Sequence, residues 1–94
     1  MDADAWMGHV SEGGCVLCLA LGVSHPPPAT IHHPREGQGL SQRADHWLSI
    51  GLCPEHHQGR SGWHGLGKRG FYQRYKLDEW DLLALTIARV AQDL

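Results

Sequence analysis

The spacing of apolar residues is clearest near the C-terminal end of the chain. From Asp78 onward, apolar side chains recur at the three- and four-residue intervals of a helix, and Asp78 itself can cap that helix. The recurring residues are Trp80, Leu83, Ala84, Ile87 and Ala91, with Leu82 and Leu85 widening the stripe. We therefore predict a helix over residues 78–92 whose apolar stripe closes the core.

Two short strands are predicted in the middle of the chain. The segment "TIHH", residues 30–33, is typical of a strand that stops at Pro34, and "HWLSIGLC", residues 46–53, is typical of a second strand. Pro54 suits the first turn of a helix, and Gly59 is a stop signal for that helix. The order strand, strand, short helix indicates a small α+β fold.

The remaining segments have the composition of connections. Residues 1–14, ending in "EGG", are expected to form a flexible N-terminal arm, with a single domain over residues 15–94. "SHPPPAT", residues 24–30, is expected to be an extended connector because consecutive prolines hold polyproline geometry. "EGQGLSQRAD", residues 36–45, and "GRSGWHGLGKRG", residues 59–70, are predicted to be loops.

Composition sets limits on the class of protein. With 94 residues, 41% of them hydrophobic and 19% charged, the chain is expected to fold as one small domain with a thin core. No apolar run approaches the roughly 20 residues that span a bilayer, and the acidic start lacks the apolar stretch of a secretory signal. We therefore expect a cytoplasmic protein with no membrane partner. Three cysteines are an odd number for a disulfide framework, so another role is expected for them.

The charge is unevenly distributed. The formal net charge is -2, but residues 35–76 hold seven basic and three acidic residues, and most of the remaining acids lie near the two ends. A basic middle can bind phosphate in a chain that is close to neutral as a whole. An ordinary solvated surface would have the same composition, so charge alone does not decide between the two.

Two residue pairs have the spacing of zinc ligands. Cys15-x-x-Cys18 and Cys53-x-x-His56 are each short enough to aim two donors at one point. A single Cys-x-x-Cys pair would also suit a thiol redox protein, but that reading leaves Cys53 and His56 unexplained. We predict a structural zinc of the Cys3His type, which would stabilise a chain of this size.

Histidines are concentrated between residues 32 and 64, where six of the eight lie. Two of them follow each other in "IHHP" and two in "EHHQ". Helix neighbours point about 100° apart, so if His56 faces the zinc, His57 must face elsewhere. Strand neighbours point to opposite faces, which separates His32 from His33 unless the chain bends before Pro34. The surplus of histidines over the four zinc ligands predicts a second cluster.

The residues "IHHPREGQGLSQRADHW" followed by "LCPEHHQGRSGWHG" resemble the HNH, or His-metal-finger, endonucleases. Within that group they are most similar to the phage recombination-enhancement (Ref-type) nucleases that depend on RecA. The resemblance covers about residues 15–75. It implies a ββα-metal core, also called HNH or treble-clef-like, in which two strands and a helix hold one divalent cation beside a structural zinc.

The resemblance also implies roles for individual histidines. His32 and His57 would be ligands of the catalytic cation, and His64 in "GWHG" would be a further ligand. His33 would be the general base that activates water.

The middle position of the motif departs from the family pattern. It is usually asparagine and here falls on His46, which would hold the base, hold its loop, or bind the metal itself. Asp45 and Trp47 are alternatives for the same position.

The expected cofactors are a structural Zn²⁺ and a catalytic divalent cation. Imidazole ligands favour manganese, nickel, cobalt or zinc over magnesium, although magnesium is not excluded. DNA phosphates would be contacted by Arg35, Arg43, Lys68 and Arg69, and Trp63 could stack on a base, with an ordinary surface role open for each.

Two functions follow as expectations. The first is a metal-dependent DNA endonuclease from a phage or prophage in a bacterial host, which nicks DNA as a monomer with little sequence specificity. A RecA-type recombinase filament is a further partner that the resemblance suggests. The second is a non-catalytic zinc module of the treble-clef kind that binds DNA or a protein. The extra histidines favour the nuclease.

Overall fold

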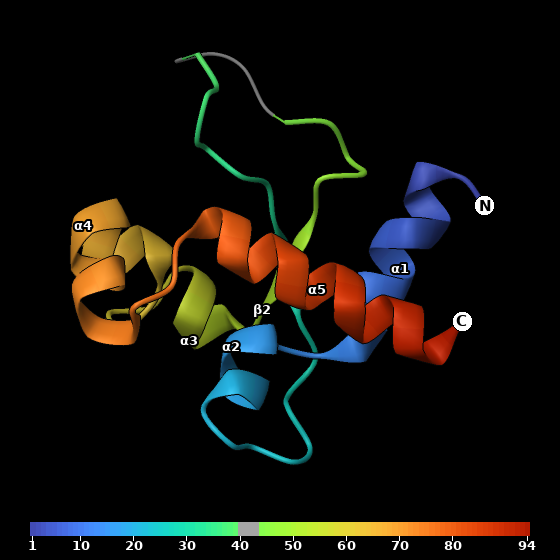
Figure 1. Ribbon diagram of the computed structural model, residues 1–94, viewed down its shortest axis with the longest axis horizontal. Coiled ribbons are helices and arrows are strands. Elements are labelled where there is room, and N and C mark those ends of the chain that lie inside the picture. Colours follow the sequence, from blue (N-terminus) through green and yellow to red (C-terminus); the bar gives the residue numbers. More distant parts are fainter. Residues whose placement is uncertain (40–43) are drawn as a thin grey trace.

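Helices surround a short pair of strands in the part of the chain that the computed structural model describes, residues 1–39 and 44–94 (Figure 1). Arg43, one of the predicted phosphate contacts, lies outside these residues. The elements follow in the order α1 (Ala3–Gly13), α2 (Val16–Ala20), β1 (Thr30–His32), β2 (Ile50–Leu52), α3 (Pro54–His57), α4 (Trp63–Tyr75) and α5 (Glu79–Asp93). The fold is small and of the α+β class. Within the described ranges, no helix is long and apolar enough to cross a membrane.

Strands β1 and β2 pair antiparallel. Thr30 lies opposite Leu52 and His32 opposite Ile50. Because side chains alternate along a strand, Thr30 and His32 share one face of β1. Both strands are shorter than predicted: β1 ends at His32, and a turn in which Leu48 N–H donates to the Asp45 carbonyl delays the start of β2. His33 therefore lies outside the strand, which frees it from strict alternation.

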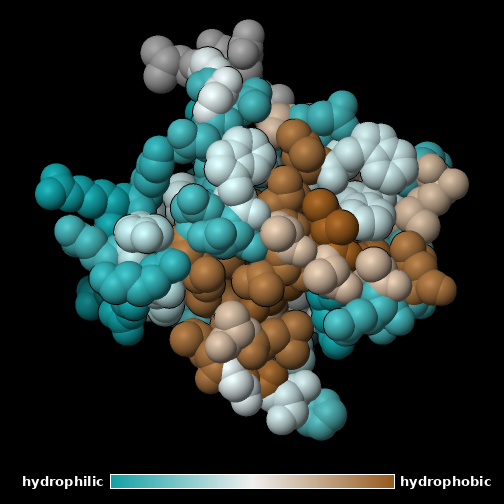
Figure 2. All heavy atoms as spheres, viewed as in Figure 1, coloured by the Kyte–Doolittle hydropathy of each residue, from teal (hydrophilic) through white to brown (hydrophobic). Residues whose placement is uncertain are grey.

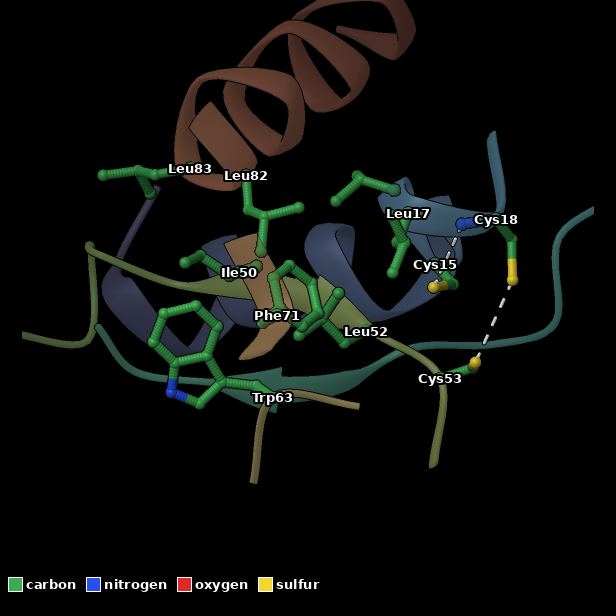
Figure 3. Close-up of a cluster of buried hydrophobic side chains, with 11 residues drawn as sticks. Cys15, Leu17, Cys18, Ile50, Leu52, Cys53, Trp63, Phe71, Leu82 and Leu83 are labelled. Carbon is green, nitrogen blue, oxygen red and sulfur yellow. Dashed lines mark hydrogen bonds between the residues drawn. The ribbon is translucent and has the colours of Figure 1, made fainter. Parts of the chain in front are cut away.

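The core lies between the sheet and the helices. Figure 3 shows Leu82 from α5 directed toward Ile50 of β2, with Phe71 and Leu52 beside them. Trp63 packs against Phe71 with ring centroids 5.1 Å apart. Trp63 is buried, so the prediction that it stacks on a DNA base is wrong.

The first residues form a packed helix where a flexible arm is predicted. Asp2 caps α1 by accepting a hydrogen bond from Ala5 N–H, and Val10 is buried. Ser11 joins α1 to the chain before β1 through its hydroxyl and carbonyl, both bonded to Ala29. Arg89 of α5 donates to the Gly13 carbonyl at 3.1 Å. The segment therefore belongs to the same folded unit as residues 15–94.

Most of the segment 59–70, predicted to be a loop, belongs to α4. Its glycines allow close backbone contact: a Cβ on Gly65 would lie 2.1 Å from the Gly59 carbonyl, and one on Gly62 would lie 2.4 Å from the Glu55 carbonyl. Only residues without a side chain let the start of α4 approach α3 and the turn that follows it this closely. Gly67, with φ of 73°, breaks the helix into two parts. The glycines therefore serve packing between two helices.

Helix α5 spans Glu79–Asp93, close to the predicted range, and begins with the expected cap. Asp78 Oδ1 accepts from Asp81 N–H, while Asp81 Oδ2 accepts from Asp78 N–H. The face that it buries differs from the predicted stripe, because Trp80 and Ile87 are 46% and 44% exposed. The buried residues of α5 are Glu79, Leu82, Leu83, Thr86 and Val90.

Two polar residues account for this rotation of the buried face. Thr86 is satisfied in the core because its hydroxyl donates to the Leu82 carbonyl and accepts from Gly51 N–H. Glu79 is satisfied through contacts with His32 and with the backbone at residues 35 and 36. Buried polar groups with partners are tolerated in a core, so the helix can turn its polar residues inward.

Candidate metal centres

The four predicted zinc ligands converge on one point. Cys15 is the N-cap of α2, Cys18 lies within α2, Cys53 is the N-cap of α3, and His56 lies within α3. His56 Nδ1 is 3.5, 3.5 and 3.4 Å from the Sγ atoms of Cys15, Cys18 and Cys53 respectively. The Sγ atoms of Cys18 and Cys53 are 3.9 Å apart (Figure 3).

These separations match the edges of a zinc tetrahedron. With Zn–S near 2.3 Å and Zn–N near 2.05 Å, tetrahedral angles give edges of about 3.8 Å between sulfurs and about 3.6 Å between sulfur and nitrogen. The three thiols are buried and are not joined in a disulfide. The group Cys15, Cys18, Cys53 and His56 could thus hold a metal ion, and its geometry suits structural zinc.

Without a cation, the surroundings of Cys18 disfavour its thiolate form. Burial, followed by hydrogen bonding and repulsion from Cys15 and Cys53, raises the pKa of Cys18 to about 12. A thiolate is the form that binds metal, and a bound cation offsets both burial and repulsion. We refer to these four residues as the thiolate centre.

A second group includes His57, the residue that follows His56 in α3. One ring nitrogen from each of His32, His57 and His64 lies within 4.8 Å of the others. The ring centroids are 5.1 Å apart for His32 and His57, 5.3 Å for His32 and His64, and 5.0 Å for His57 and His64. His32 is buried, His57 is half-buried and His64 is exposed, so the group opens toward solvent. We call these three residues the histidine centre.

A threonine sets the tautomer of His57. The Thr30 hydroxyl donates its only hydrogen to the Leu52 carbonyl at 2.8 Å, and its oxygen lies 2.9 Å from His57 Nδ1. Because the hydroxyl hydrogen is already used, the oxygen must accept from Nδ1–H. His57 then carries its lone pair on Nε2, which is the nitrogen suited to a metal.

His57 and His64 favour their neutral form. Burial, followed by repulsion from His32, His64 and His33, lowers the pKa of His57 to about 4. Burial, followed by His32 and, more weakly, Arg35, also lowers the pKa of His64. Neutral imidazole is the form that binds metal, so this environment prepares both rings for a cation.

Glu79 is a member of this environment that the sequence reasoning missed. Its Oε2 lies 2.6 Å from His32 Nε2, and its carboxylate also accepts from the backbone N–H groups of Arg35 and Glu36. Burial raises the pKa of Glu79, but the hydrogen bonds from His32 and from the two backbone groups outweigh it and lower the pKa below its usual value. An acidic residue in the first turn of a helix is common, so its position in the sequence gave no signal of this role.

His33 and His46 form a pair next to the histidine centre. His33 Nε2 lies 3.0 Å from His46 Nδ1. His33 is near enough that its charge is among the causes that lower the pKa of His57. Of the three candidates for the middle position, His46 is the one shown in contact with His33. Asp45 instead accepts from Trp47 N–H in a turn, and the Trp47 ring lies 6.1 Å from that of Trp6.

The predicted phosphate contacts lie in different settings. Lys68 pairs with Glu36 at 2.6 Å on the surface. Lys68 and Arg69, with Tyr72 and Gln73, line a surface hollow of about 470 Å³ on α4. The side of the molecule that carries α4 is hydrophilic, whereas apolar residues gather toward the middle of the same face (Figure 2).

Comparison with known proteins adds no assignment. No protein-family model matches the chain, and searches of the curated proteins and of the solved structures found no match.

Proposed function

We propose that this protein is a metal-dependent endonuclease of the HNH type that hydrolyses phosphodiester bonds in DNA. The observation that carries the proposal is the histidine centre, which is accompanied by the His33–His46 pair and is linked to the thiolate centre through α3. The order β1, β2, α3, with His32 ending β1 and His57 ending α3, supports a ββα-metal core.

Phosphodiester hydrolysis requires an activated water, neutralised charge on the phosphate, and stabilisation of the leaving 3′ oxygen. In the proposal, His33 accepts the proton of the attacking water, since imidazole titrates near neutral pH. His46 orients His33 through their 3.0 Å contact, and Ser49 holds His46 by donating to its carbonyl. Arg35, which is exposed and acts electrostatically on His64, would contact the substrate phosphate.

His32, His57 and His64 would hold the catalytic cation. A divalent ion bound there supplies Lewis-acid stabilisation of the phosphate and of the leaving oxygen. Three imidazole donors favour manganese, cobalt, nickel or zinc over magnesium. The single histidine centre among the described residues favours nicking of one strand by a monomer.

The alternative is a zinc module of the treble-clef kind that binds DNA or a protein without cleaving it. The thiolate centre alone would suffice for such a module, since its four donors complete a tetrahedron. Such a module does not need His32, His57 and His64. The pKa values of His57 and His64 are lowered, and the ring of His32 is held by Glu79. This surplus favours the nuclease.

The proposal is tested by nicking of supercoiled plasmid. Wild type, His33→Ala and His25→Ala would each be incubated with manganese, magnesium or chelator, with and without a RecA filament. His25 is an exposed histidine outside both centres, so its variant controls for the loss of an imidazole. We expect metal-dependent nicking by wild type and His25→Ala, and loss of at least about a hundredfold in His33→Ala, as general-base catalysis implies.

Nicking decides between the two functions, and zinc content shows that the thiolate centre is intact in each protein compared. Nicking lost in His33→Ala, with one zinc retained per chain, would support the nuclease and the base. No cleavage by wild type under any of these conditions, with one zinc bound, would favour the binding module.

A further inference from the structure

The pair formed by His32 and Glu79 is the most deeply buried polar contact of the histidine centre. Both side chains are 2% exposed, and the two atoms in contact are 2.6 Å apart. Burying a carboxylate is costly unless it is fully hydrogen-bonded. The contact also joins residues 47 positions apart, at the end of β1 and the start of α5.

The carboxylate of Glu79 is held on several sides. Arg35 N–H lies 2.9 Å from both carboxylate oxygens, and Glu36 N–H lies 2.9 Å from Oε1. These backbone groups directly follow the segment His32–Pro34. Glu79 therefore fixes the chain on the far side of His33 as well as the ring of His32, and its own orientation is set by three donors.

The contact also determines which nitrogen of His32 faces a metal. With a carboxylate at Nε2, the proton of the neutral ring resides on Nε2, and the lone pair resides on Nδ1. A histidine ligand that gives its other N–H to a carboxylate is held in one orientation and becomes a better donor to the metal. Glu79 is not among the three residues whose donor atoms lie together, so it acts behind His32 rather than as a fourth ligand.

We propose that Glu79 is the positioning residue of the histidine centre: its carboxylate holds His32 in the Nε2–H tautomer and directs Nδ1 toward a divalent cation. The proposal rests on the metal-binding part of the proposed function and does not require DNA cleavage. In this proposal the first turn of α5 supports the metal site from behind His32.

The test measures metal affinity and tautomer in the full chain. The protein would be loaded with one equivalent of zinc, which the thiolate centre takes first, and then titrated with cobalt(II) by calorimetry. Glu79→Gln keeps the size and a neutral acceptor but removes the charge. Glu36→Gln removes a carboxylate from a partly exposed position nearby and serves as the charge-matched control. We expect cobalt binding to weaken by about tenfold to a hundredfold in Glu79→Gln, and by less than about twofold in Glu36→Gln, as for an exposed charge.

Nitrogen-15 spectra of the histidine rings give a second readout that a merely structural role would not move. In zinc-loaded wild type without cobalt, we expect His32 to be protonated on Nε2 and not on Nδ1. If Glu79→Gln fails to fold, this spectrum of the wild type still decides. A His32 ring protonated on Nδ1, or a folded Glu79→Gln that binds cobalt as wild type does, would overturn the proposal, as would wild type that binds no second metal.

The two proposals fail in different ways. Weakened cobalt binding in Glu79→Gln together with no plasmid nicking by wild type would support Glu79 as a positioning residue and reject the nuclease. Nicking by wild type with unchanged cobalt affinity in Glu79→Gln would do the reverse.

Discussion

His56 and His57 are adjacent in α3, yet their rings belong to different centres. His56 Nδ1 lies 3.4 Å from Cys53 Sγ, whereas His57 Nδ1 lies 2.9 Å from Thr30 Oγ1. One turn of helix therefore supplies one histidine to the thiolate centre and one to the histidine centre. Because α3 is only four residues long, its position orients both rings.

Because the two rings belong to different centres, substitution of His56 and of His57 should abolish the binding of different metal ions. His56→Ala should lose the zinc and much of the fold, because structural zinc contributes folding free energy directly. His57→Ala should keep one zinc and the helical circular dichroism spectrum but lose cobalt binding at the histidine centre. Zinc content, circular dichroism and cobalt calorimetry check the pair. Retention of one tightly bound zinc by His56→Ala would contradict the assignment of the thiolate centre.

A methyl group on Gly65 should push α4 away from the turn that follows α3. Its Cβ would lie 2.1 Å from the Gly59 carbonyl, so the backbone must shift, and we expect a loss of about 1–3 kcal/mol in the free energy of unfolding. Cobalt affinity should also fall, because His64 is the neighbouring residue in α4. Gly8→Ala is the control, because nothing lies within 4 Å of its Cβ and it should stabilise α1 by about 0.5–1 kcal/mol. Urea unfolding measures both, and equal stabilities of the two variants would refute this role of Gly65.

The hydroxyl of Thr30 should matter more than its methyl group. Thr30→Val removes the acceptor for His57 Nδ1–H, so the ring loses its fixed tautomer, and cobalt affinity should fall by about tenfold. Thr30→Ser keeps the hydroxyl and should stay within about threefold of wild type. Calorimetry on the zinc-loaded proteins compares them. Similar losses in both variants would show that side-chain packing, and not the hydrogen bond, sets the affinity.

The lowered pKa of His57 predicts a dependence of stability on pH. In the folded protein without a second metal this pKa is about 4, against 6.5 for an unperturbed histidine. Between these values the unfolded chain binds more protons, so the contribution of His57 to stability is fully present above about pH 6.5 and is lost as the pH falls toward 4.

The share of His57 can be isolated by comparison with His57→Gln. Urea unfolding of both zinc-loaded proteins at several pH values from about 7.5 down to 5 should show a steeper loss of stability for wild type. Release of zinc in acid affects both proteins alike and cancels in the difference. Parallel pH curves would show that His57 has an ordinary pKa in the folded protein.

Local spacing identified the four residues of the thiolate centre, because Cys-x-x-Cys and Cys-x-x-His constrain direction over a few residues, and the surplus of histidines predicted a second cluster. The choice of His32, His57 and His64 as its members came from the resemblance to the HNH endonucleases. Contacts between residues far apart in the sequence cannot be predicted from local spacing. Glu79 reaches His32 only because α5 turns a polar residue inward, and nothing in its neighbours distinguishes it from an ordinary acidic residue in a first helical turn.

Helices α1, α2 and α4 were not predicted, and α1 and α4 were missed for different physical reasons. Helix α1 buries only Val10 and Gly13, so it has almost no apolar stripe to detect. Helix α4 contains several glycines, which are poor helix formers, and its contact with α3 outweighs that propensity. In α5 the pattern indicated the helix but not its buried face, because Thr86 is satisfied in the core while Ile87 is exposed.

The contact between His32 and Glu79 has a consequence for synthesis of the chain. The last zinc ligand, His56, emerges from the ribosome before Glu79, so the thiolate centre can close while α5 is still being made. The histidine centre acquires its buried carboxylate only when α5 docks. In the proposal, a nascent chain would thus close the thiolate centre around zinc first, and the proposed second metal site would be complete only after α5 has docked.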